Sequence, residues 1–148
     1  MTRFTFFFLA IVLFAIASCS DNVRKSEAVK THRIVKTYFS DSITERVVWE
    51  YPEGNDSVIS VSHFYNNKQM QMQGNIVGGV RNGEWVAWDK EGRKMSTGHY
   101  VDGFENGLWS VWYPSGQKRY EGMFKDGNRI GLWLFYDQEG NRIKEIKY

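Results

Sequence analysis

The sequence predicts an all-β protein: an antiparallel β-meander of repeated β-hairpins after an N-terminal signal peptide. Three observations predict this fold. A 24-residue pattern occurs three times between Gln69 and Arg142. No stretch after residues 1–18 keeps a helical period, whereas alternating polar and apolar residues and turn sequences are frequent. A fixed period of this length is typical of an array of units that cannot each bury an apolar face alone.

The repeat is defined by four glycine columns and two aromatic columns. All but two of the 14 glycines lie in the glycine columns. Those columns are Gly74/Gly98/Gly122, Gly79/Gly103/Gly127, Gly83/Gly107/Gly131 and Gly92/Gly116/Gly140. The first aromatic column is Trp85/Trp109/Trp133 and the second is Trp88/Trp112/Tyr136. We therefore expect three hairpin repeats over residues 69–148.

Residues 1–18 are expected to be a lipoprotein signal peptide. The run from Phe4 to Ala17 is almost wholly apolar but shorter than the roughly 20 residues that span a bilayer. Ile16-Ala17-Ser18-Cys19 resembles the lipobox of bacterial lipoproteins, which implies cleavage before Cys19 and attachment of lipid to its sulfur. The alternative is an ordinary secretory peptide that contains a cysteine. Cys19 is the only cysteine of the chain, so it has no disulfide partner within it.

This resemblance implies a protein of the bacterial cell envelope, held to a membrane by its N-terminal lipid. Aspartate after the cysteine resembles an inner-membrane retention signal, and Ser20 stands there instead. The outer membrane is therefore expected rather than the inner one. Residues 19–32 are predicted to be the lipidated cysteine and a flexible tether, because this segment is polar with mixed charges.

Residues 33–68 are interpreted as degenerate N-terminal strands that cap the array. Shifting Trp85 and Trp88 back by one period gives Val61 and Phe64, which are also apolar, although the glycines are lost. Terminal units of an array are usually atypical. The strands expected here are Ile34–Phe39, Ile43–Tyr51 and Val58–Tyr65, followed by Lys68–Val77.

The middle repeat predicts the structure of each unit. Met95–Val101 forms one strand, Asp102–Gly107 a glycine-rich connection and Leu108–Tyr113 the return strand, with a turn at Pro114–Gln117. Glycine inside a strand normally weakens pairing. At Gly98 it has a physical reason, because a tryptophan of the neighbouring strand can lie across bare backbone. The first aromatic column is therefore expected to pack on such glycines.

The second aromatic column is the better candidate for binding. Trp85 and Trp88 are three residues apart, so a regular strand places them on opposite faces. Two alternatives remain: a sheet covered on both sides, or a bulge that brings both columns to one face. Exposed aromatic rings stack on sugars or receive apolar side chains of a partner, whereas packing alone would also require them. A cationic column, Lys94/Lys118/Arg142, recurs at the same period. It could bind anionic groups, or it could only keep the starts of the strands solvated and discourage aggregation.

The columns together resemble the bacterial variant of the MORN repeat. The resemblance rests on Gly98-His99-Tyr100, Asp102-Gly103, Gly107-Leu108-Trp109 and the run from Trp112 to Gly116, with weaker and stronger copies on either side. It implies an array of hairpins that contacts proteins or lipids. Many bacterial members of this family are described as antitoxin-like.

No catalytic, metal-binding or cofactor-binding residues are predicted. The histidines His32, His63 and His99 are scattered, and no Gly-x-Ser-x-Gly sequence occurs. Acidic residues at turns lack the spacing of a calcium loop. A formal net charge of +2, without a basic cluster, argues against a nucleic-acid partner.

These observations favour a non-catalytic, envelope-anchored repeat lipoprotein whose sheet surface serves protein interaction or scaffolding. The candidate binding surface is Trp88, Trp112, Tyr136, Lys94, Lys118 and Arg142. The alternatives are a glycan-binding surface lipoprotein that uses the second aromatic column, and an antitoxin-like or immunity protein.

Overall fold

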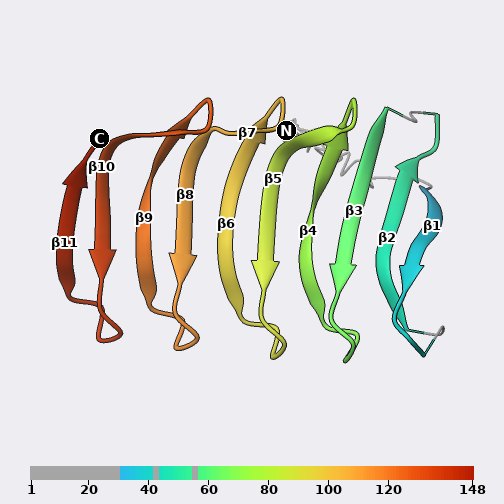
Figure 1. Ribbon diagram of the computed structural model, residues 1–148, viewed down its shortest axis with the longest axis horizontal. Coiled ribbons are helices and arrows are strands. Elements are labelled where there is room, and N and C mark those ends of the chain that lie inside the picture. The colour runs from blue at the N-terminus through green and yellow to red at the C-terminus, as the bar shows by residue number, and fades with distance from the viewer. Residues whose placement is uncertain (1–30, 42–43, 55–56) are drawn as a thin grey trace, which may run out of the picture.

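A computed structural model describes residues 31–148 except residues 42–43 and 55–56. The predicted signal peptide, Cys19 and the predicted tether up to residue 30 lie outside the described residues. In the described part the chain forms one antiparallel sheet of 11 strands and no helix (Figure 1). The strands are β1 Thr31–Tyr38, β2 Glu45–Pro52, β3 Val58–Phe64, β4 Met70–Val77, β5 Val80–Trp88, β6 Lys94–Val101, β7 Phe104–Glu105, β8 Gly107–Trp112, β9 Lys118–Lys125, β10 Asn128–Tyr136 and β11 Arg142–Lys147.

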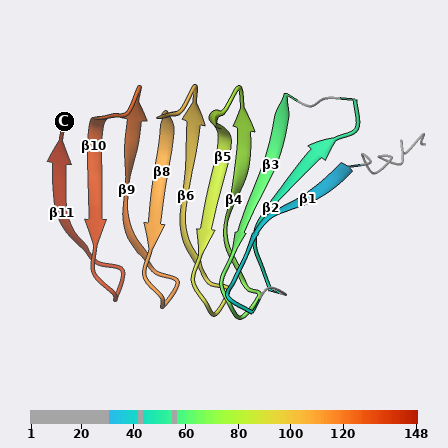
Figure 2. The same cartoon turned by 45° about the vertical axis from the view of Figure 1, so that its right-hand side comes forward.

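The strands follow one another across the sheet in chain order, which confirms the predicted meander. The order runs from β1 to β11, with short β7 paired to β6 off this path. The described strands form a single layer with no second layer over either face (Figures 1 and 2). In Figure 2, β1 is strongly inclined to β11, as expected from the twist between neighbouring strands.

Tight two-residue turns join the strands of each hairpin at one end of the sheet. Asp102 and Gly103 have φ values of 50° and 87°, and Asp126 and Gly127 have 48° and 78°. Two consecutive positive φ values define the type I′ turn, whose twist matches that of the flanking strands. The predicted connection Asp102–Gly107 is wrong in length: the turn ends at Gly103, and β7 and the start of β8 follow.

The turns at the other end also repeat, and they extend the array into its N-terminal cap. Each has a backbone N–H bonded to a carbonyl four residues on, as in Tyr65 to Gln69 at 2.9 Å and Asp89 to Arg93 at 3.0 Å. Lys68 has a φ of 67° at the position that holds Gly92 one period later, with a φ of 82°. The turn between β3 and β4 therefore has the geometry of the later turns despite its altered sequence. The cap begins earlier than expected, since β1 starts at Thr31, inside the predicted tether.

Tryptophan packed across glycine forms the core of the sheet, as predicted. A Cβ added to Gly74, Gly98 or Gly122 would lie 2.2, 1.9 or 2.2 Å from the indole of Trp85, Trp109 or Trp133. No side chain fits at these glycines. Trp85 and Trp133 are only 5% and 1% exposed although the sheet has one layer.

Aromatic rings of alternate columns continue this packing along the sheet. They meet edge to face at centroid distances from 5.0 to 6.3 Å, an arrangement that adds about 1 kcal/mol per pair beyond the buried area. In chain order the ladder is Trp85, Tyr100, Trp109, Phe124, Trp133 and Tyr148. We call the side of the sheet that carries it the core face.

Candidate binding surface

The two aromatic columns lie on opposite faces of the sheet. Along β5 the partners Trp85↔Gly98, Val86↔Thr97 and Ala87↔Ser96 follow without interruption. The next pair is Trp88↔Lys94, so the register passes over one residue of β6, Met95, and none of β5. Trp88 therefore points away from the core face. A sheet covered on both sides is excluded because the layer is single. A bulge that brings both aromatic columns to one face is excluded because the bulge lies on the partner strand.

The aromatic and cationic columns combine into one line. Trp88 pairs with Lys94, and the same pairing recurs one and two periods later. Lys94 Nζ on β6 also lies 5.8 Å from the ring centroid of Trp112 on the neighbouring strand β8. Rings and cations thus alternate on successive strands of the face opposite the core face. We call this line the stripe; it consists of Trp88, Lys94, Trp112, Lys118, Tyr136 and Arg142.

Carboxylates hold two of the three cations of the stripe. Lys118 Nζ lies 2.5 Å from Glu121 Oε2, and Arg142 Nη1 lies 2.6 Å from Glu145 Oε1. The hydroxyl of Tyr136 donates to Glu121 at 3.2 Å. Burial, together with this bond to the charged Glu121, raises the pKa of the Tyr136 phenol. This end of the stripe is therefore an ordered and nearly neutralised polar network.

Lys94 has different surroundings. Thr97 occupies the position of Glu121 and Glu145 in this repeat, and its hydroxyl donates to Glu84 Oε1 at 2.9 Å. Within the described part of the chain, Lys94 is in none of the ion pairs. It is therefore the cation of the stripe that remains available to an anionic group.

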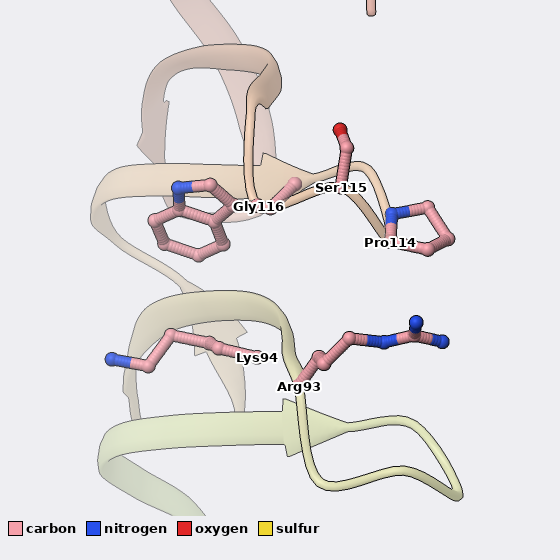
Figure 3. Close-up of a pocket in the computed structure, with 6 residues that line it drawn as sticks. Arg93, Lys94, Pro114, Ser115 and Gly116 are labelled. Carbon is pink, nitrogen blue, oxygen red and sulfur yellow. The ribbon is translucent and has the colours of Figure 1, made fainter.

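A shallow pocket of about 410 Å³ lies beside Lys94 and Trp112 (Figure 3). Its other walls come from Arg93 and the turn Pro114–Gly116. Figure 3 shows Arg93 and Lys94 extending in opposite directions from adjacent positions. The guanidinium of Arg93 bonds to Asp89 at 2.7 Å and to Glu91 at 2.9 Å, so Arg93 is engaged in its own turn.

The structure thus brings all six predicted surface residues together, and it adds partners that the sequence patterns did not single out. Those partners are Glu84, Thr97, Glu121 and Glu145. Positions 97, 121 and 145 form one column at the period of the repeat. A comparison of this column with the cationic column in the sequence could therefore have predicted the partners Glu121 and Glu145. Over residues 31–41, 44–54 and 57–148, no group of histidine, cysteine, aspartate or glutamate side chains is arranged to hold a metal ion. The same ranges contain no helix long and apolar enough to cross a membrane.

A single-layer sheet of repeated hairpins with glycine–tryptophan packing defines the class of the protein as a β-hairpin repeat protein. Sequence comparison gives the kind of repeat: the family model described as MORN repeat variant matches residues 105–126. This match covers the second half of the middle unit and the whole of strands β8 and β9, and it supports the MORN resemblance. No curated protein matches the chain.

Proposed function

We propose that this protein is a non-catalytic interaction module of the bacterial cell envelope, and that its stripe binds a protein partner. The observation that carries the proposal is the alternation of rings and cations along one uncovered face. Strands lie about 4.8 Å apart, so like residues of the stripe recur about every 10 Å. A partner with acidic and apolar side chains at a similar spacing would complement it.

The chemistry of the stripe resembles that of binding hot spots. Tryptophan, tyrosine and arginine dominate such sites, and partly buried rings contribute large contact area with little loss of side-chain freedom. The rings of Trp88, Trp112 and Tyr136 are half-buried, which fixes their orientation before a partner arrives. Lys94 adds an unpaired charge that favours an acidic partner and fast association.

Cross-linking in intact cells tests the proposal. An epitope-tagged chain is cross-linked, captured and examined by mass spectrometry, beside a variant that carries Lys94→Ala and Trp112→Ala. We expect one dominant protein, lost from the variant at equal abundance of the two chains. Leu108→Ala is the matched control, because Leu108 is exposed on the same face but outside the stripe. It should retain the partner.

Two results would overturn the proposal. One is capture of the same abundant envelope proteins by both chains, with no protein specific to the stripe. The other is saturable binding of soluble oligosaccharides that Trp112→Ala abolishes, without a captured protein. That second result would identify the stripe as a glycan-binding surface instead.

A further inference from the structure

The core face contains a gap in an otherwise continuous row of side chains. Six residues are direct cross-strand partners of one another from β4 to β10, and they form this row. They are Met72, Ala87, Ser96, Val111, Tyr120 and Phe135. The row runs parallel to the aromatic ladder. Its two smallest members, Ala87 and Ser96, are neighbours.

The next repeat shows what these two positions hold elsewhere in the same chain. One period after Ala87 and Ser96 stand Val111 and Tyr120. The ring of Tyr120 packs against that of Phe135 at a centroid distance of 5.8 Å. The backbone of this row therefore accommodates a tyrosine ring at the position where the preceding unit carries only a serine.

A hollow of about 450 Å³ results at these two residues of the core face, and its lining also includes Trp88 of the stripe. Ala87 and Ser96 lie between walls that include Met72, Trp109 and Tyr120. Sites for organic ligands and anchoring side chains are commonly of this size, about 300–1,000 Å³, and lined by aromatic and apolar groups with few polar ones. We call this hollow the Ala87–Ser96 socket.

The charges around the socket restrict what it can receive. All of its lining residues are uncharged, in contrast to the cationic stripe on the other face. Arg81 lies beside the adjoining hollow, but its guanidinium stacks over the Trp85 ring at 4.2 Å and donates to Tyr100 at 3.1 Å. An uncharged occupant therefore complements the socket, since a buried charge would lack a partner there.

We propose that the socket seats an uncharged aromatic side chain presented by a protein partner. The ring would fill the place that Tyr120 fills one repeat later, between Met72 and the Trp109 wall. Sulfur–aromatic and edge-to-face contacts favour such a ring there. Ala87 and Ser96 at its centre lie on the core face, while Trp88 of the stripe is also among its lining residues. The socket is therefore an additional site that adjoins one end of the stripe.

Methyl NMR of the purified full chain, labelled at its methionine methyl groups, tests this site. N-acetyl-L-tryptophanamide and N-acetyl-L-tyrosinamide serve as probes, and methyl glucoside serves as a sugar probe. Met72 and Met95 line the socket, whereas Met123 is exposed outside it. We expect saturable shifts of the Met72 and Met95 signals with the aromatic amides, and no matching shift of Met123.

Ser96→Tyr is the decisive variant, because it copies the residue that the chain already holds at position 120. It should fold, fill the socket and weaken binding of both aromatic amides by about tenfold or more, which corresponds to at least about 1.4 kcal/mol. Leu108→Ala, an exposed position that is in neither the socket nor the stripe, should bind them as the unaltered chain does. Equal binding to Ser96→Tyr would overturn the proposal. So would equal shifts at Met123, or a response of Met72 and Met95 to methyl glucoside alone.

Discussion

At the scale of single residues, three indole rings packed on glycines form the core that a second layer of secondary structure would otherwise provide. Each tryptophan of the first column covers a glycine on the preceding strand. Two of these tryptophans also donate a hydrogen bond to the carbonyl of the residue that follows the glycine. Trp85 Nε1 donates to Asn75 O, and Trp133 Nε1 donates to Met123 O, both at 3.2 Å. In the middle repeat the equivalent carbonyl, His99 O, accepts from the Asn106 N–H at 2.8 Å. There a different edge of the indole, at Cε3 and Cζ3 of Trp109, lies nearest the glycine.

Gly98→Ala should therefore be strongly destabilising. Its new methyl group would lie 1.9 Å from Trp109 Cε3, so the indole must leave its place in the ladder. Overpacking of this kind typically lowers the free energy of unfolding by about 1–3 kcal/mol, and the displaced ring adds to the loss. Urea unfolding followed by circular dichroism measures the change.

The background Trp109→Leu provides the control for this clash. The single variant loses stability by itself, but Gly98→Ala should then cause a much smaller further loss. A strictly additive effect in the double variant would show that the clash is not the cause.

At the scale of elements, the repeated turn geometry extends further towards the N-terminus than the glycine columns do. Lys68 replaces a glycine, so the sequence does not show the repeat at this position, yet the chain adopts the same positive φ there. Propensity and periodicity predicted the strands and the meander, since alternation and turn residues are local signals. They could not show that the register passes over Met95, because a bulge depends on the pairing of two strands. The merging of two columns into the stripe follows from that pairing.

The small residues of the socket could be predicted from the sequence by comparing side-chain volume, rather than residue type, within each repeat column. The positions of Ala87 and Ser96 recur as Val111 and Tyr120, so their small size stands out once columns are read for volume. That these four side chains lie in one row requires the cross-strand register, which only the structure supplies.

Lys68→Gly is expected to stabilise the protein. A residue with a side chain loses about 1–2 kcal/mol in the left-handed region relative to its ordinary conformation, and glycine does not. Part of this gain is offset by the greater freedom of glycine in the unfolded chain. We expect a net increase of about 0.5–1 kcal/mol in the free energy of unfolding, measured by urea titration.

Gly116→Lys is the reciprocal variant for that turn. Gly116 has a φ of 88° and open space around it, so only backbone conformation opposes the change. It should lower stability by a similar amount. A stabilising Gly116→Lys, or a neutral Lys68→Gly, would contradict this explanation.

At the scale of the whole molecule, the array is a single sheet in which each strand packs on the strands next to it. Both faces are uncovered by other elements in the described part of the chain. Most of the stripe therefore lies on the face opposite Ala87 and Ser96 of the socket, while Trp88 belongs to both sites.

The lipid anchor predicted at Cys19 belongs to this scale, because it would place the whole sheet at a membrane surface. We expect the unaltered protein in the outer-membrane fraction after density separation, and incorporation of labelled palmitate. Cys19→Ser should abolish both, since two or three acyl chains provide stable anchoring and none would remain. Unlabelled protein in the soluble fraction of unaltered cells would instead indicate ordinary secretion.

The one-layer, nearest-neighbour packing has a consequence for length. A further 24-residue unit could be inserted without altering any contact inside the existing hairpins, because each unit meets only the next. Every such unit would extend the stripe by one ring and one cation, or about 10 Å. If the stripe binds a partner as proposed, the number of repeats sets the length of the partner segment that it can contact. A gain or loss of units would change that length and leave the chemistry of the stripe unchanged.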